Sequence, residues 1–235
     1  MAAIEVRDLT LTYRQGEPSV VQALAGVTLS VQAGEFVSVV GRSGTGKTTL
    51  LHAVGLLVRP TSGRVVLDGV DTTALSDHER ASFRGGRIGF VLRRHGLLPA
   101  LTVLENVMLP LRYAPIGTRR GRRARELLDL VGLAGHVDDR PDQLTVGQAQ
   151  RAAIARALIK APALVLADEP TADVDDETSD ELLYLLQQLN RTSGVTLVVA
   201  TDDPDVASCL DRVIRLRDGR VVSDQRLRVD RKRPG

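Results

Sequence analysis

The sequence is poor in cysteine and in aromatic residues, and it contains no long hydrophobic run. Its only cysteine, Cys209, excludes a framework of internal disulfide bonds, and a cytosolic location fits this composition. No apolar stretch approaches the ~20 residues that cross a bilayer, so a role at a membrane requires a partner. The charged residues Glu5, Arg7 and Asp8 stand where an export signal has its apolar core, which predicts that no such signal is present.

A strong net charge is also missing. The 31 Lys and Arg residues nearly balance the 29 Asp and Glu residues, which gives little support for nucleic-acid binding. One basic run lies within 119–125, but no aromatic residues are interleaved with its arginines, which favours a solvated helix start. We therefore expect no nucleic-acid partner.

A glycine-rich segment, 41–49, follows the apolar run 36–40 and precedes an apolar helical pattern. It matches the phosphate-loop motif, in which glycine, four variable residues and a second glycine precede Lys and Ser/Thr. The glycines let backbone amides turn inward around phosphates, Lys47 can reach the terminal phosphates, and the Thr48 hydroxyl can ligate magnesium. The alternative is a glycine-rich turn with an incidental lysine. The flanking strand and helix favour a nucleoside triphosphate site.

A second motif lies at 164–169, where an apolar run ends in Asp168 and Glu169. A buried strand that ends in two carboxylates can place one of them beside the metal ion and the nucleotide. Asp168 would hold magnesium, and Glu169 would polarise the attacking water as a general base. The alternative is an exposed acidic turn after a strand, which the presence of the phosphate loop disfavours.

Continuous apolar strands that alternate with helical patterns predict a parallel α/β sheet with its nucleotide loop at the strand ends. The expected class is α/β, a P-loop NTPase core with a mainly parallel sheet, an N-terminal antiparallel β subdomain and an inserted α-helical subdomain. We expect one domain over 1–235, with its core at 1–92 and 162–235 and its helical subdomain at 93–161. Strands are expected at 4–6, 9–13, 20–24, 27–31, 36–40, 65–70, 88–92, 163–167, 195–200, 213–216 and 221–222. Helices are expected at 75–83, 101–111, 119–131, 146–159 and 176–189.

The order of these motifs resembles the ATP-binding subunit of ABC transporters over essentially the whole chain. Between the phosphate loop and the acidic pair, 144–148 and the following 150–158 match the family signature and its helix. Similarity to ATPases of lipoprotein-release, macrolide-efflux and cell-division type complexes is carried by 59–63, 88–91 and 97–107. The resemblance implies ATP and Mg²⁺ as cofactors and an integral membrane transporter subunit as partner. It also implies a second ATP-binding subunit, with each ATP between one phosphate loop and the other subunit's signature.

The resemblance assigns roles to individual residues. Lys47 and Glu169 are implied as catalytic, and Thr48 and Asp168 as magnesium ligands. Nucleotide contacts are implied for Tyr13, Gly41, Arg42, Ser43, Gly44, Thr45, Gly46, Lys47, Thr48, Thr49, Thr145, Gly147 and Gln148. Tyr13 would stack on adenine, with an ordinary strand tyrosine as the alternative. Asp175 would cross the dimer interface, and an acid at a helix N-terminus is an equal alternative.

Three positions near the terminal phosphate depart from the family pattern. Arg93 replaces a glutamine that contacts magnesium and water, Val146 replaces a signature glycine, and Asp202 replaces a histidine that holds the γ-phosphate. A guanidinium cannot ligate a cation, and phosphate would repel a carboxylate. Either the chain is a paralogue with reduced hydrolysis, or Arg93 and Asp202 form a compensating ion pair.

The leading expectation is an ATP-hydrolysing subunit that drives a membrane-embedded partner, by transport or by transmitted force. We expect it to be cytoplasmic and peripheral on the inner face of the cell membrane. The alternative is a weakly hydrolysing regulatory half of a heterodimeric ABC complex, which Arg93, Val146 and Asp202 favour. An ATPase that acts on nucleic acid or ribosomes is disfavoured, because such proteins usually carry two such domains or a long coiled-coil insertion.

Overall fold

The computed structural model describes residues 2–15, 19–113 and 119–227. The chain divides into two compact units, one formed by 1–75 and 196–235 and the other by 76–195. These boundaries differ from those of the predicted core and helical subdomain, so that functional division stays a prediction. Within the described residues, none of the helices combines the length and the apolar character needed to cross a bilayer.

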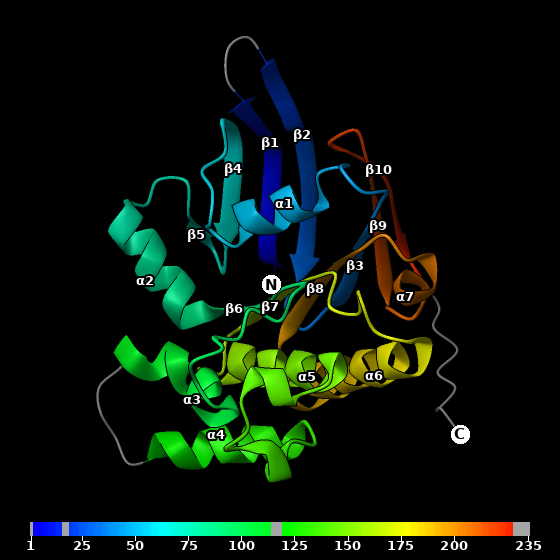
Figure 1. Cartoon of the computed structure of the whole chain (residues 1–235). Coiled ribbons are helices and arrows are strands. Elements are labelled where there is room, and N and C mark those ends of the chain that lie inside the picture. The colour runs from blue at the N-terminus through cyan, green and yellow to red at the C-terminus, as the bar shows by residue number, and fades with distance from the viewer. Residues whose placement is uncertain (1, 16–18, 114–118, 228–235) are drawn as a thin grey trace. The chain divides into compact units, whose positions relative to one another are not determined.

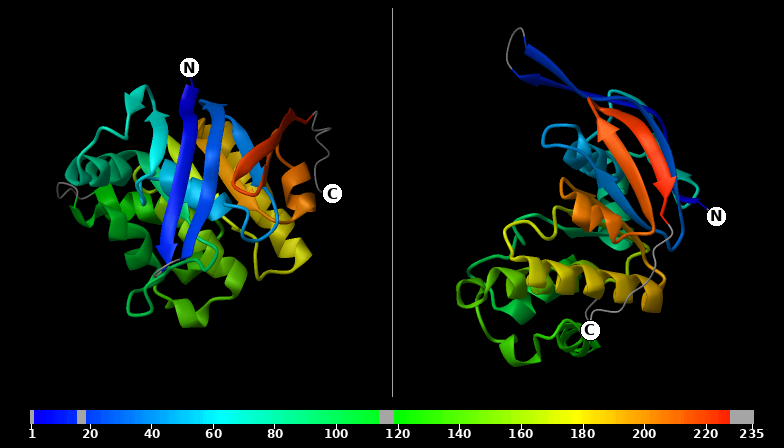
Figure 2. Two further views of the ribbon diagram at one scale, coloured as in Figure 1. Left: turned by 90° about the horizontal axis from the view of Figure 1, so that it is seen from above. Right: turned by 90° about the vertical axis from the view of Figure 1, so that its right-hand side faces the viewer.

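The first unit begins with a long antiparallel hairpin of β1 (Ala2–Gln15) and β2 (Ser19–Gln32), whose strands run side by side in Figure 2. β4 (Ser62–Leu67) pairs with the other edge of β1, and β5 (Val70–Asp71) completes the order β2-β1-β4-β5. This sheet agrees with the predicted antiparallel N-terminal subdomain. The predicted turn at 16–18 lies outside the described residues.

A second group of strands in the first unit leads to the phosphate loop. Its order is β10-β9-β3-β8, in which β3 pairs in parallel with β8 and β9, and β9 and β10 form an antiparallel hairpin. Every residue of β3 and β8 is buried, as is typical of central strands in a parallel sheet. The bounds are β3 (Phe36–Val40), β8 (Thr196–Thr201), β9 (Arg212–Arg217), β10 (Arg220–Arg226), α1 (Lys47–Val54) and α7 (Pro204–Ser208).

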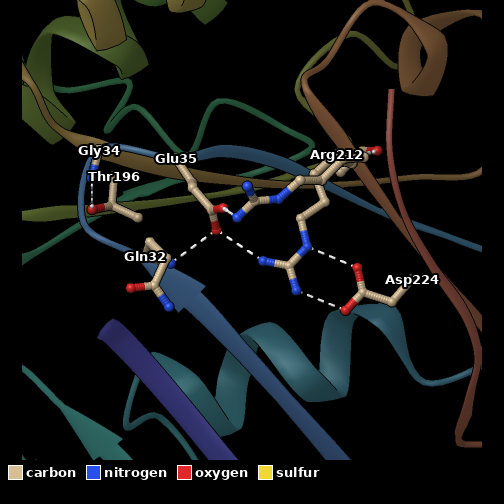
Figure 3. A network of polar contacts seen from close by, with 8 residues as sticks. Gln32, Gly34, Glu35, Thr196, Arg212 and Asp224 are labelled. Atoms are coloured by element: carbon tan, nitrogen blue, oxygen red, sulfur yellow. Dashed lines mark hydrogen bonds and ion pairs between the residues drawn. The ribbon is translucent and has the colours of Figure 1, made fainter. Parts of the chain in front are cut away.

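A polar network holds the turn before β3 (Figure 3). The Glu35 carboxylate accepts hydrogen bonds from the Gln32 backbone N–H at 2.8 Å, from Arg212 at 2.8 Å and from Arg226 at 2.9 Å. Arg212 also donates twice to Asp224, with both N···O distances 2.7 Å, and its side chain is only 12% exposed. The hydrogen bonds to Asp224 raise the pKa of Arg212, so the guanidinium stays charged. The network fixes where β3 begins and thereby where the phosphate loop follows.

The second unit contains two parallel strands, β6 (Ile88–Val91) and β7 (Leu164–Asp168), and most of the helices. β6 packs closely on α5 (Val146–Leu158), because a Cβ on Gly89 would lie 2.5 Å from the Ala157 carbonyl oxygen. Helices α3, α4 and α5 lie together in Figure 1. The remaining bounds are α2 (Asp77–Arg87), α3 (Val103–Met108), α4 (Arg119–Leu130), α6 (Asp176–Ser193), and the 3₁₀ helices η1 (Leu109–Tyr113), η2 (Ala134–His136) and η3 (Pro141–Gln143).

Capping residues fix the starts of several helices in this unit. Ser76, Thr102 and Thr145 each form a capping box with a Glu or Gln three residues later, so two unpaired N–H groups are satisfied at each start. The predicted helix over 101–111 is α-helical only to Met108, where a 3₁₀ turn begins. Pro110 explains the change, because it has no N–H to continue the α-helical pattern.

Candidate functional site

The phosphate loop connects β3 to α1 in the first unit. α1 begins at Lys47 directly after Gly46, so the unpaired amides of its first turn lie at the end of the loop. Thr45 closes the loop on itself, because its backbone N–H (3.3 Å) and its hydroxyl (2.8 Å) both donate to the Arg42 carbonyl oxygen. The strand, loop and helix that the motif requires are therefore all present.

Glycines permit the close packing of this loop. Gly46 has a φ of 103°, and a Cβ there would lie 2.5 Å from the Ala23 carbonyl oxygen. A Cβ on Gly41 would likewise lie 2.5 Å from the Leu216 carbonyl oxygen. Gly44, by contrast, has a φ of 80°, and a Cβ there would have no heavy atom of the described residues within 4 Å. The loop is therefore packed against backbone at its two ends and is open at its middle.

Lys47 is nearly buried, with 5% of its surface exposed. Its Nζ donates to the Gly41 carbonyl oxygen at 2.7 Å and to that of Arg42 at 3.4 Å. The ammonium group is thus held over carbonyls of the same loop whose amides are candidates for phosphate binding. A fixed cation at this place fits an anionic ligand.

The turn between β9 and β10 supports the loop, which the sequence alone did not reveal. The Gly219 N–H donates to the Thr45 carbonyl oxygen at 3.1 Å, and the Gly219 carbonyl accepts from the Ala25 N–H at 2.9 Å. Gly219 has a φ of 70°, and a Cβ there would lie 2.7 Å from the Ala23 carbonyl oxygen. The Asp-Gly pair signals a hairpin turn in the sequence, but only the fold brings that turn to the phosphate loop.

Asp202 lies at the strand end from which the phosphate loop starts. It follows Thr201 of β8, whose Cα pairs with that of Val40 in β3, and Gly41 follows Val40 directly. Asp202 therefore follows β8 in the first unit, at the sheet edge where the loop begins. The repulsion from phosphate that we expected at this position stays a prediction.

Tyr13 lies in β1 opposite Val21 of β2. The two residues are 36% and 47% exposed, so an aromatic ring and an apolar side chain are accessible on the hairpin. An accessible ring is what stacking on adenine requires, although the stacking itself stays a prediction.

The acidic pair lies at the end of β7 in the second unit. β6 and β7 are parallel, with Val91 opposite Ala167, so the chain leaves both strands at the same edge. Asp168 is the last residue of β7 and Glu169 follows it, and both are half-buried; Arg93 lies two residues beyond Val91. Glu169 has a φ of 48°, a left-handed conformation that is uncommon outside glycine and that clusters at functional sites.

Arg93 forms an ion pair with Asp173, with 4.0 Å between Arg93 Nε and the carboxylate. Both side chains are more than half exposed, and pairs of this kind contribute roughly 0–1 kcal/mol. Asp202, the partner hypothesised from the sequence, belongs to the other unit, so that pairing stays a prediction. The opposite charge found next to Arg93 is therefore that of a residue in the loop after β7.

The signature segment 144–148 forms the start of α5. The Thr145 hydroxyl accepts from the Gln148 N–H at 3.2 Å, and the Gln148 side chain accepts from the Thr145 N–H at 2.9 Å. A Cβ on Gly147 would lie 2.5 Å from Thr178 Cγ2 of α6, so a larger residue here would have to displace the Thr178 side chain, whose hydroxyl is bonded to Asp175. Val146 is 51% exposed, so its branched side chain lies largely on the surface.

Asp175 is the N-cap of α6. Its carboxylate accepts hydrogen bonds from the Thr178 backbone N–H at 2.8 Å and from the Thr178 hydroxyl at 2.9 Å, and these bonds lower the pKa of Asp175. Asp175 is therefore an acid at a helix N-terminus, as one of the two sequence alternatives expected. Its role across a dimer interface stays a prediction.

Helix α5 also binds the chain directly after β6. Gln150 Nε2 donates to the Leu92 carbonyl oxygen at 3.0 Å. Arg156 donates to the carbonyl oxygens of His95 and Gly96, each at 2.5 Å. The helix that begins with the signature thus also holds the segment that carries Arg93.

His95 is expected to make the stability of the protein depend on pH. Its pKa lies below the ordinary value of 6.5, mainly through burial and secondly through the charge of Arg156, and its Nδ1 accepts from the Leu97 N–H. His95 binds a proton more readily in the unfolded chain than in the folded chain. Protonation therefore favours unfolding, and the free energy of unfolding falls as the pH drops below about 6.5. Between about pH 7.5 and pH 5.5, the thermal midpoint should fall less in His95→Asn, which keeps an acceptor but does not titrate, than in the wild type. Equal falls in the two proteins would contradict this account.

Comparison with known proteins decides the family. The model of the family described as ABC transporter matches residues 24–172, which include the phosphate loop, the signature segment and the acidic pair. The chain belongs to the ABC transporter family. This membership confirms the resemblance found in the sequence and the expected function of an ATP-binding and ATP-hydrolysing subunit.

Individual relatives give a finer comparison. The chain is 50% identical over 224 residues to the lipoprotein-releasing system ATP-binding protein LolD of Geobacter metallireducens, covering 94% of this chain and 98% of LolD. It is 49% identical over 222 residues to the macrolide export ATP-binding/permease protein MacB of Syntrophobacter fumaroxidans, covering 93% of this chain. It spans only 31% of that MacB. The dimeric ABC transporter cassette MJ0796 of Methanocaldococcus jannaschii matches with a TM-score of 0.88 at 43% identity, covering 96% of this chain and 99% of MJ0796, which confirms the α/β fold class.

Proposed function

We propose that this chain is the ATPase subunit of a membrane complex of the lipoprotein-release or macrolide-export type. The observation that carries the proposal is the phosphate loop, in which Gly41 and Gly46 are packed too closely for a side chain and Lys47 is held over the loop. The similarity to LolD over nearly its whole length supports the type of complex.

The proposed ATP site uses the residues expected from the sequence. Residues 41–49 bind the phosphates through backbone amides and Lys47, and Tyr13 stacks on adenine. Thr145, Gly147 and Gln148 of a second subunit complete the site. Thr48 and Asp168 would hold Mg²⁺, because a hydroxyl and a carboxylate are the hard oxygen donors that this ion prefers. When bound, the ion neutralises charge on the terminal phosphates.

Glu169 acts as the general base in this proposal. Its carboxylate accepts a proton from the water that attacks the γ-phosphate, and Lys47 stabilises the negative charge on the phosphate oxygens. ADP is the leaving group, and inorganic phosphate takes the oxygen of the water. The turn at Glu169, with its left-handed backbone, supports this role because it holds the carboxylate at the edge where β6 and β7 end.

The proposed partners are a second ATP-binding subunit and an integral membrane subunit. The dimer of MJ0796 supports the first, and the names of LolD and MacB, a lipoprotein-releasing system and a permease, support the second. We place the membrane contact near 93–104, with the core at 1–92 and 162–235 and the helical subdomain at 93–161. This arrangement places the protein peripherally on the cytoplasmic face of the membrane.

A regulatory half with weak hydrolysis is the second candidate. The position of Asp202 after β8, at the sheet edge where the phosphate loop begins, favours it, because a negative charge at this edge opposes the approach of a phosphate. The Arg93–Asp173 pair adds to this argument, because an arginine engaged with a carboxylate replaces a residue that contacts magnesium in the family. In this case the chain would bind ATP and dimerise while its partner subunit hydrolyses.

Phosphate release by the purified chain tests the proposal. We expect release that requires Mg²⁺ and that increases when the chain is assembled with its integral membrane partner subunit. Chelation of Mg²⁺ should abolish release, and addition of excess Mg²⁺ should restore it. ATP binding without phosphate release, alone or with the partner, would favour the regulatory candidate, and absence of ATP binding would overturn both.

A further inference from the structure

A chain of hydrogen bonds joins the signature to a turn that no motif predicts. The Asp139 carboxylate lies 2.6 Å from His136 Nδ1, and His136 Nε2 lies 3.1 Å from Gln148 Nε2. Gln148 is joined in turn to Thr145 by the two bonds of the capping box. His136 therefore connects Asp139 with the first turn of the signature helix.

The direction of these bonds is fixed by the groups at the two ends. The Thr145 backbone N–H requires an acceptor, so Gln148 presents Oε1 to it and the Nε2 amide to His136. The Asp139 carboxylate only accepts, so His136 Nδ1 carries a proton. His136 Nε2 must then accept from Gln148, which defines a neutral imidazole with its proton on Nδ1. A second proton on the ring would place two donors face to face.

The same turn is bonded to the start of α3. The Val103 N–H donates to the Asp139 carbonyl oxygen at 2.8 Å, and the Leu104 N–H donates to that of Val137 at 3.0 Å. His136 thus links the signature helix with a turn whose backbone is hydrogen-bonded to the start of α3. The side chains of His136 and Asp139 are only about one-third exposed, so the link is partly shielded from water.

We propose that His136 is a positioning residue that holds the signature segment in the orientation needed to meet ATP on a second subunit. His136 acts through Gln148 and does not touch nucleotide itself. The inference rests on the proposed function, because it assumes that residues 145–148 complete the site of the other copy. Its measurable consequence is the ATP-dependent association of two chains.

Two substitutions of His136 each keep one of its two side-chain hydrogen bonds and remove the other. His136→Asn keeps a donor near the position of Nδ1 for Asp139 but does not reach Gln148. His136→Gln reaches Gln148 with an acceptor but loses the bond to Asp139. Both are made in the full chain carrying Glu169→Gln, which keeps ATP bound, and dimerisation with ATP is measured by sedimentation. We expect His136→Asn to weaken the dimer about 3–10-fold, as loss of one hydrogen bond implies, and His136→Gln to stay within about twofold of the parent.

Two further measurements distinguish a folding defect from a loss of positioning as the cause of a weaker dimer. The affinity of the monomer for ATP should be unchanged in both variants, because the phosphate loop lies in the other unit. In the wild type, ¹⁵N NMR should find the His136 proton on Nδ1. Equal loss in both variants, loss confined to His136→Gln, or a proton on Nε2 of the neutral ring would overturn the inference. Failure of the proposed function differs from these outcomes, since wild-type phosphate release would then not depend on Glu169.

Discussion

Replacement of Glu169 by glutamine should lower the rate of phosphate release about 10²–10⁴-fold, the range that general-base catalysis contributes. Glutamine has nearly the same shape as glutamate, but its amide does not take a proton from the attacking water. The affinity for ATP should change little, because the phosphate loop and Lys47 are untouched. Steady-state phosphate release and equilibrium binding of ATP to the same preparation measure the two effects separately.

Glu126→Gln is the matched control for this experiment. Glu126 lies in α4, where it pairs with Arg122 at 2.9 Å, and its side chain is 49% exposed. Loss of an exposed pair of this kind is worth about 0.5 kcal/mol or less, so hydrolysis should stay close to the wild-type rate. If Glu169→Gln retains more than about half of the wild-type rate, Glu169 is not the general base. If the wild type binds ATP but releases no phosphate above background, the regulatory candidate is favoured.

Replacement of Gly46 by alanine should reduce ATP affinity by roughly 100-fold or more. The new Cβ would lie 2.5 Å from the Ala23 carbonyl oxygen and 3.0 Å from Leu24 Cδ2, and φ at this position is 103°. An unfavourable φ alone costs of order 1–3 kcal/mol, and the clash with the carbonyl oxygen forces the backbone to move as well. Because that backbone forms the phosphate site, its displacement removes binding. Titration calorimetry with ATP measures the loss, and thermal unfolding reports whether the fold survives.

Gly44→Ala separates the two causes. Gly44 also has a positive φ of 80°, but a Cβ there would have no heavy atom of the described residues within 4 Å. This variant shares the strain of a left-handed conformation and lacks the clash, so its ATP affinity should fall far less than that of Gly46→Ala. Affinities within about threefold of each other, a difference of about 0.7 kcal/mol, would show that close packing against Ala23 is not what shapes the loop.

The features that the sequence predicts well are those whose signals are local. The phosphate loop is a continuous motif between an apolar strand and a helix, and the structure has β3, the loop and α1 in that order. The helices expected at 75–83 and 146–159 begin at Asp77 and Val146 in the structure, where a capping box within four residues of sequence fixes each start. The acidic pair likewise follows a continuous buried strand. In each case the residues that interact are neighbours in the chain.

The N-terminal hairpin was predicted less well, because its strands are interrupted. Four short strands were expected, whereas the structure has two long ones. The register between them shifts near Asp8, whose φ is 47°, and Gly26 in the partner strand has a φ of 73°. Such irregularities break the alternation of apolar and polar residues on which strand prediction depends. The pairing continues across them, but the sequence pattern does not.

Contacts between distant segments could not be predicted from the sequence. Gly219 supports the phosphate loop from more than 170 positions away, as the bond from its N–H to the Thr45 carbonyl shows. The sequence suggested an oppositely charged partner for Arg93, but which carboxylate lies near it depends on how β6 and β7 are paired. His136 carries no motif, and only its distances to Asp139 and Gln148 reveal a role.

Helix α5 is a stiff connection between the signature segment and the segment after β6. Its thirteen residues span roughly 20 Å, with the signature at one end and Arg156, bound to the carbonyls of His95 and Gly96, near the other. A rotation of about 5° around one end would displace the opposite end by almost 2 Å over this length. In such a rigid rotation, the displacement of one helix end relative to the other is set by the length of the helix. A small push on the segment after β6 would arrive at the signature as a movement comparable to the length of a hydrogen bond.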